Sequence, residues 1–134
     1  MFLEIKSDPA ELKEVRKQLE EFCEKNLKGI DIFKIKLSVD EALQNIIRHA
    51  YKMDKDKKIK IEFDKDSKDN LRIRLRDYGI QTPIDKIKSR ELDDIRPGGL
   101  GVHFIKSSTK EMNYEHQEDG GTLLTLVFWL FFFN

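Results

Sequence analysis

A glutamate and an asparagine lie one helical turn apart within residues 31–51. Glu41 and Asn45 are four residues apart, so on a helix their side chains are neighbours, and Arg48 falls on the same side. A carboxylate placed in this way can accept a proton from an attacking hydroxyl or water. An amide oxygen beside it can ligate Mg²⁺. The alternative for this segment alone is an ordinary solvated helix face.

Two further short motifs could contribute to a ligand site. Asp77 and Gly79 follow the strand expected over residues 71–76, where a carboxylate could accept a hydrogen bond from the exocyclic amine of adenine. The alternative is a plain Asp-x-Gly turn, in which Gly79 permits a tight backbone turn. Thr122, after Gly120-Gly121, could support an adenine contact through its hydroxyl, although the pair of glycines needs no function beyond the turn.

A fourth motif is rich in glycine and opens a helix expected from residue 100. Gly98, Gly99 and Gly101 would expose backbone N–H groups at the positive end of the helix, which favours an anion such as phosphate. No Gly-Lys-Ser/Thr follows, so this is not a P-loop, and the spacing does not fit a dinucleotide-binding fingerprint. The alternative is a flexible hinge or a simple helix start.

The elements that must position these motifs can be read from local periodicity. Strands are expected over residues 2–6, 58–64, 71–76, 114–117 and 122–130, and helices over residues 9–28, 31–51 and 100–112. The first helix should begin with Asp8 as the N-cap, Pro9 at its first position and Glu11 completing a capping box, and Gly29 should cap its end. Residues 78–99 show weak periodicity and indicate a binding loop or lid.

Alternation in the middle strands predicts a sheet with one buried face. Apolar residues alternate with charged residues over 58–64 and 71–76, as in an antiparallel sheet covered on one side. The order of elements predicts an α/β two-layer sandwich, with helices on one face of a mixed, mostly antiparallel sheet. The length of 134 residues favours a single domain, residues 1–134.

Composition excludes several classes of protein. The 25 basic and 25 acidic residues cancel, which argues against a general nucleic-acid binder. Cys23 is the single cysteine, so no internal disulfide or cysteine-based zinc site is possible. The first residues become charged at once, unlike a secretory signal, and the apolar stretch 123–133 is too short to span a bilayer as a helix. We therefore expect a cytoplasmic protein with no membrane contact.

Taken together in their order along the chain, the four motifs resemble those of the Bergerat-fold (GHKL) ATPase superfamily. The stretches LSVDEALQNIIRHAY and RPGGLGVHFIKSSTKEMNYEHQEDGGTLLTLVF are most similar to the small bacterial anti-sigma factor serine kinases. The resemblance covers residues 2–129 and implies the Bergerat/GHKL fold.

The resemblance also implies a role for each motif. Glu41 matches the general base of the family and Asn45 its magnesium ligand, whereas Asp77 matches the adenine-recognition carboxylate, with Gly79 in its turn. The remaining matches are phosphate contacts in the glycine lid and one threonine near adenine: Gly99, Leu100, Gly101 and Thr122. Because the chain has no P-loop lysine, the phosphate charge would be balanced by Mg²⁺, by the helix N-terminus and by Arg48 or Arg96.

The function implied by the resemblance is an ATP- and Mg²⁺-dependent protein serine/threonine kinase. Members of the family phosphorylate an antagonist protein, and many also bind a sigma factor, in a partner-switching pathway that regulates transcription. Direct contact with nucleic acid is not expected. Residues 131–133 are all phenylalanine, and they favour self-association into a homodimer, with a strand end tucked into the core as the alternative.

Other functions remain open at this point. After Gly79 the chain reads Ile80-Gln81-Thr82, where relatives more often place a Gly or Pro followed by a Phe. This departure favours, as the main alternative, a nucleotide-gated module that sequesters a partner without phosphotransfer. The ATP-binding half of a histidine kinase is disfavoured by the absence of an upstream helical region carrying a histidine. An α/β domain that binds no nucleotide is the remaining possibility.

Overall fold

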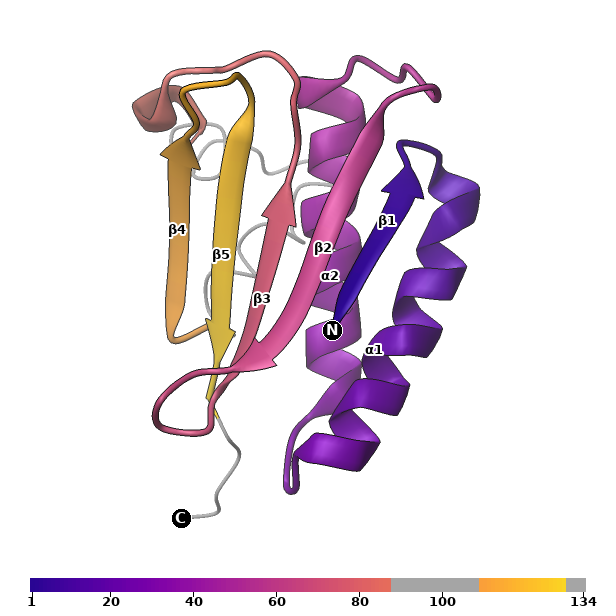
Figure 1. Cartoon of the computed structure of the whole chain (residues 1–134), viewed down its shortest axis with the longest axis vertical. Coiled ribbons are helices and arrows are strands. Elements are labelled where there is room, and N and C mark those ends of the chain that lie inside the picture. Colours follow the sequence, from indigo (N-terminus) through magenta and orange to yellow (C-terminus); the bar gives the residue numbers. More distant parts are fainter. Residues whose placement is uncertain (88–108, 130–134) are drawn as a thin grey trace.

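The computed structural model describes residues 1–87 and 109–129 and forms two layers (Figure 1). Two helices cover one face of a five-stranded sheet, as the sequence predicts. The elements in chain order are β1 (Phe2–Lys6), the 3₁₀ turn η1 (Pro9–Glu11), α1 (Leu12–Asn26), α2 (Ile32–Asn45), the π-helical turn η2 (Ile46–Ala50), β2 (Lys58–Lys65), β3 (Leu71–Arg76), β4 (Glu111–His116) and β5 (Thr122–Phe128).

The sheet order is β1-β2-β3-β5-β4, and each pairing among these strands is antiparallel. The α/β two-layer class predicted from the sequence is confirmed. Because β5 runs antiparallel beside β3, the end of β3 and the start of β5 lie together at one end of the molecule (Figure 1). The end of η2 lies there as well, since the Ile80 N–H donates to the Ala50 carbonyl. This end carries the turn formed by Asp77 and Gly79 and the glycine pair Gly120-Gly121.

The start of the first helix differs in detail from its prediction. Asp8 caps as expected, since its carboxylate accepts from the Ala10 N–H at 3.0 Å, but the first turn is 3₁₀. Glu11 accepts from the Lys6 N–H at 2.9 Å, so the predicted capping box does not form. The prediction that Gly29 caps the helix is also wrong, because α1 ends at Asn26 and Leu27 turns to extended backbone, where its side chain is buried.

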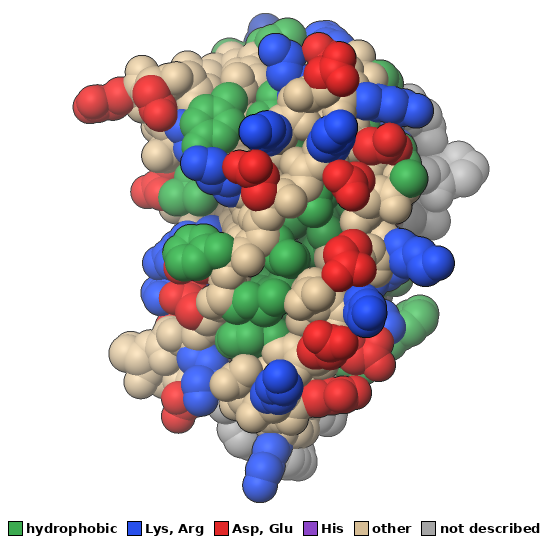
Figure 2. Space-filling model, turned by 45° about the vertical axis from the view of Figure 1, so that its right-hand side comes forward, with side chains coloured by type: hydrophobic (Ala, Val, Ile, Leu, Met, Phe, Trp, Pro, Cys, Tyr) green, Lys and Arg blue, Asp and Glu red, His purple; other side chains and the backbone are tan. Residues whose placement is uncertain are grey.

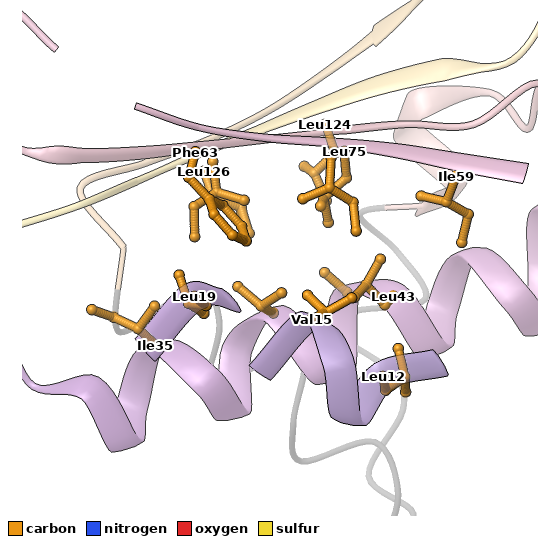
Figure 3. Close-up of a cluster of buried hydrophobic side chains, with 14 of the residues drawn as sticks. Leu12, Val15, Leu19, Ile35, Leu43, Ile59, Phe63, Leu75, Leu124 and Leu126 are labelled. Carbon is orange, nitrogen blue, oxygen red and sulfur yellow. The ribbon is translucent and has the colours of Figure 1, made fainter. Parts of the chain in front are cut away.

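The core lies between the helices and the sheet, and its side chains point toward one another across the two layers (Figure 3). Each fully buried Leu, Ile, Val or Phe stabilises the fold by about 1.5–3 kcal/mol relative to an exposed one. The helices contribute Leu12, Val15, Leu19, Ile35 and Leu43, and the sheet contributes Ile59, Phe63, Leu75, Leu124 and Leu126. The apolar faces of both helices and both middle strands therefore match their periodicity.

The other face of the sheet carries charged side chains that pair across strands. Arg72 donates to both carboxylate oxygens of Asp64 at 2.9 and 2.7 Å, and this hydrogen bonding lowers the pKa of Asp64. Arg74 donates to Glu62 at 2.8 Å. On the α1 side of the molecule, basic and acidic side chains are interspersed around a strip of hydrophobic ones (Figure 2). That mixture agrees with the zero net charge of the chain.

The C-terminal hairpin begins earlier than predicted. The helix expected to end at Met112 does not reach that residue, because β4 starts at Glu111 and Met112 pairs with Leu126 in the ladder. Met112 and Tyr114 pack against the core, so tertiary contacts decide the strand here. The predicted start of that helix, near residue 100, lies outside the described residues. In the described part of the chain, no helix has the length and apolar character needed to cross a membrane.

Candidate functional site

Glu41, Asn45 and Arg48 form a polar stripe along α2 and η2, on the side away from the core. This stripe contains a buried carboxylate oxygen. Glu41 is partly buried, and its Oε2 atom is enclosed with no hydrogen-bond partner among the described residues. Burial raises the pKa of Glu41, whereas the Arg48 charge lowers it and the Asp40 charge raises it. A carboxylate with a raised pKa and an unused acceptor atom is suited to taking a proton from a bound group.

Asn45 and Arg48 lie next to Glu41 along the same stripe, as their spacing predicts. Asn45 is the last residue of α2, and its Oδ1 atom accepts a hydrogen bond from Arg48 Nη2 at 3.0 Å. The residues on the other side of the helix, Val39, Ala42, Leu43, Ile46 and Ile47, are buried in the core. The stripe is thereby fixed in orientation by core packing behind it.

The sequence predicts one helix over residues 31–51, but α2 does not continue as a regular α-helix to Tyr51. Residues Ile46–Ala50 form a π-helical turn, in which the Tyr51 N–H donates to the Ile46 carbonyl at 3.0 Å. The segment contains no proline or glycine that would impose this geometry. The wide turn instead accompanies packing of its last residues against the Asp77–Gly79 turn, and π-turns are frequent at functional sites.

Tyr51 connects the end of this helix to the strands. Its side chain is 5% exposed, and its hydroxyl donates to the Lys58 carbonyl at 2.5 Å and accepts from the Tyr78 N–H at 2.7 Å. Sequence reasoning did not identify this residue. A tyrosine at the end of an apolar helix face, which needs a partner for its hydroxyl when buried, is the signal that could have found it.

Asp77 is a buried carboxylate at the end of β3. The residue is 4% exposed, and its Oδ1 atom accepts from the Gly79 N–H at 2.9 Å. Burial raises the pKa of Asp77, while the Gly79 N–H and the Arg76 charge lower it. The backbones of Asp77 and Thr122 exchange two hydrogen bonds, at 3.0 and 3.2 Å, so both predicted residues lie side by side.

The sequence suggests that Gly79 allows a tight backbone turn, but in the structure the position requires glycine because the Ala50 backbone lies so close to it. A Cβ atom at this position would collide with the carbonyl of Ala50, at the end of η2. The neighbouring Ile80 N–H donates to that same carbonyl at 3.0 Å. Gly79 therefore lets the α2–η2 helix and the Asp77 turn meet, and it joins the two groups of predicted site residues.

Arg76 fixes the turn between β4 and β5 relative to Asp77. Its Nη1 atom donates to the carbonyls of Asp77 and Gly120 at 2.5 and 2.7 Å, and its Nη2 atom pairs with Asp119 at 2.5 Å. The guanidinium also lies over the Tyr78 ring, 4.1 Å from its centroid. In the sequence Arg76 reads as one more exposed strand residue, so its role was missed.

Gly121 is expected to be the less replaceable glycine of the pair before Thr122. Both glycines have positive φ angles, but a Cβ atom at Gly121 would also overlap the Asp77 carbonyl, whereas one at Gly120 meets nothing within 4 Å. Left-handed backbone costs a non-glycine residue about 1–2 kcal/mol. Gly121→Ala should therefore lower the free energy of unfolding by more than Gly120→Ala, measured by chemical denaturation. Equal losses would contradict the close contact.

Some of the predicted site residues fall in other parts of the chain than those that the structure describes. Gly99, Leu100 and Gly101, and the alternative phosphate partner Arg96, lie outside the described residues, as does the phenylalanine run 131–133. Of the predicted residues that are described, Glu41, Asn45 and Arg48 form one group, and Asp77, Gly79 and Thr122 form another. The contact between Gly79 and Ala50 places the second group against the helix that carries the first.

Comparison with known proteins gives this arrangement a family context. Residues 5–128 match the family described as the histidine kinase-like ATPase domain. The serine-protein kinase RsbW of Bacillus licheniformis is 31% identical, in an alignment that covers 69% of this chain and 72% of that protein. RsbW of Staphylococcus aureus strain MSSA476 is 32% identical, with 69% of this chain and 63% of that protein covered, so the chain spans less than two thirds of this relative.

A solved structure shares the fold. The crystal structure of the SiaB–SiaC complex from Pseudomonas aeruginosa contains a chain that matches with a TM-score of 0.70 and 13% identity, covering 95% of this chain and 88% of that one. At this identity the likeness concerns the fold alone. Together with the family match, it confirms the GHKL fold expected from the motifs.

Proposed function

Because this chain belongs to the histidine kinase-like ATPase family, we propose that it is an ATP-dependent protein serine/threonine kinase of the anti-sigma factor type. It would transfer phosphate from ATP to a serine or threonine of an antagonist protein in a partner-switching pathway. The names of its relatives, which are serine-protein kinases, support this reaction. Residues 1–134 would form one ATP-binding domain, acting in the cytoplasm where transcription takes place.

The observation that carries the proposal is the buried Oε2 atom of Glu41, which has no hydrogen-bond partner in the part of the chain that the structure describes. A carboxylate oxygen without a hydrogen bond is costly to bury, so its retention calls for a chemical reason. In the proposed reaction, the oxygen of the acceptor hydroxyl attacks the terminal phosphorus of ATP and Glu41 accepts the proton of that hydroxyl. The bond between this phosphorus and the bridging oxygen breaks, and ADP leaves. The pKa of Glu41 is raised towards neutral pH, which makes its carboxylate a stronger base.

The nucleotide would lie between the two groups of residues. The Asp77 carboxylate, with Thr122 beside it, would accept a hydrogen bond from the exocyclic amine of adenine. Asn45 would offer its amide oxygen to Mg²⁺, which supplies charge neutralisation for the phosphates when bound. In residues 1–87 and 109–129 no group of three His, Cys, Asp or Glu side chains could hold a metal, so phosphate oxygens and water molecules would complete the coordination. Arg48, Gly99, Leu100 and Gly101 would contact those phosphates.

Magnesium-dependent ATP binding tests this assignment most directly. Wild-type protein should bind ATP more tightly when Mg²⁺ is present, as measured by isothermal titration calorimetry. Asn45→Ala should lose most of this dependence, because it removes the amide oxygen, while its metal-free affinity changes little. If Asn45→Ala keeps the full magnesium dependence, the assignment of Asn45 is wrong. If wild-type protein binds no ATP in either condition, the kinase proposal fails as a whole.

A nucleotide-gated module that sequesters a partner without phosphotransfer is the second candidate. The segment after Gly79, which departs from the family pattern, is held by the Gln81 amide group on the carbonyls of Gln117 and Gly121, both at 2.8 Å. Radiolabel transfer from ATP to a panel of candidate antagonist proteins separates the two functions. ATP-dependent capture of a panel member without labelling would favour the module. Besides the antagonist protein, the kinase proposal includes two further partners, a sigma factor and a second copy of this chain.

A further inference from the structure

Arg48 holds the oxygen atom that the proposed function assigns to a metal ion. Its Nη2 atom donates to Asn45 Oδ1 at 3.0 Å, so the amide oxygen already faces a cationic group. The Arg48 charge also acts on Glu41, where it opposes the effect of burial. One guanidinium thus supplies positive charge to both members of the Glu41–Asn45 pair.

Arg48 also lies at the surface of the molecule. Its side chain is exposed, and it forms no ion pair with any residue in the described ranges, in contrast to Arg16, which pairs with Asp40 at 2.8 Å. It lies within the π-helical turn, one turn beyond Asn45, while the backbone of that turn is fixed by Tyr51 and Ile80. The side chain can therefore exchange partners without moving the helix.

We propose that Arg48 is a positioning residue that exchanges partners when the nucleotide binds. This inference rests on the proposed function. Before binding, Arg48 orients the Asn45 carboxamide and offsets the charge of Glu41. A guanidinium and a divalent cation repel each other when both contact one amide oxygen, whereas phosphate oxygens attract the guanidinium strongly. On binding, Arg48 therefore turns from Asn45 to the phosphates, and the amide oxygen becomes available for coordination.

The experiment measures nucleotide affinity by calorimetry with AMP-PNP, an ATP analogue that resists hydrolysis, in EDTA and over a magnesium series. Arg48→Gln should weaken metal-free binding by about 10-fold, the effect of one charge-assisted hydrogen bond. It should also lower the magnesium concentration needed for half-maximal binding. Arg48→Lys should restore the metal-free affinity, because it returns a positive charge to the phosphates.

A double mutant links the effect to the amide oxygen. In the Asn45→Ala background, Arg48→Gln should no longer shift the magnesium concentration for half-maximal binding, since no oxygen remains to be contested. Lys17→Gln removes a charge from the exposed face of α1 and should change neither quantity. Circular dichroism of each variant checks that the fold is retained.

Two outcomes would overturn the exchange. One is a magnesium requirement that is unchanged or increased in Arg48→Gln, which would make Arg48 a simple phosphate contact or a surface residue. The other is a shift of equal size in the Asn45→Ala background, which would make it a long-range charge effect. Either result leaves the kinase proposal standing. If wild-type protein fails to bind AMP-PNP with or without magnesium, the proposed function itself fails and takes this inference with it.

Discussion

Glu41→Gln should reduce phosphate transfer by roughly 10²–10⁴-fold while leaving nucleotide binding almost intact. Glutamine keeps the size of the side chain and an acceptor oxygen, but it cannot take a proton from the acceptor hydroxyl. The measurement is radiolabel transfer from ATP to an antagonist protein that the wild type labels, with ATP hydrolysis followed in parallel. Binding of Mg²⁺–ATP is measured on the same preparations by calorimetry.

Asp40→Asn is the matched control for this variant. Asp40 is the adjacent carboxylate on α2, but it pairs with Arg16 at 2.8 Å. Replacing it removes a negative charge beside Glu41 and leaves the proposed base in place, so transfer should change by only a few fold. If Glu41→Gln transfers phosphate at the wild-type rate, Glu41 is not the base. If both variants lose activity equally, the loss reflects the charge of this helix face.

Asp77→Asn should weaken ATP binding by roughly 10–150-fold, corresponding to the 1.5–3 kcal/mol typical of a hydrogen bond to a charged group. Asparagine can still accept from the Gly79 N–H through its oxygen, so the turn should remain. However, its amide group offers a donor where the adenine amine needs an acceptor. The comparison of ATP with inosine triphosphate, which lacks that amine, provides the readout by calorimetry.

Wild-type protein should prefer ATP over inosine triphosphate, and Asp77→Asn should lose this preference. An equal loss of affinity for both nucleotides would mean that the substitution disturbs the site generally. Unchanged affinity for ATP would show that Asp77 does not contact the base. Thermal unfolding of the variant, run beside the wild type, checks that its fold is intact.

The same variant should alter the pH dependence of stability. Burial raises the pKa of Asp77 in the folded state, so the folded protein binds this proton more tightly than the unfolded chain does. The stability contributed by protonation is full below the unfolded pKa of about 3.9 and is lost as the pH rises through the raised value. Asp77→Asn should therefore gain stability relative to the wild type from acid to neutral pH, as measured by urea denaturation. A constant difference would contradict the raised pKa.

The sequence determined the layers and the pairing of nearby site residues, because those features depend on local periodicity. A period of two assigns Ile59, Phe63 and Leu75 to the buried face of a sheet, and a period near 3.6 places Glu41 beside Asn45. The position of Asp77 after a strand is likewise local. No knowledge of distant contacts was needed for these features, and the family motifs follow the same order along the chain.

Only the tertiary structure decided how the two groups of site residues meet. The fit of Gly79 against Ala50 and the hydrogen bond from the Tyr78 N–H to the Tyr51 hydroxyl join segments 27 or more residues apart, and the π-helical turn ends at this contact. Arg76 reaches the Gly120 carbonyl across 44 residues. Such contacts depend on how whole elements pack, and no local pattern in the sequence encodes that packing. The same is true of the enclosure of Glu41 Oε2, which gives the proposed base its raised pKa.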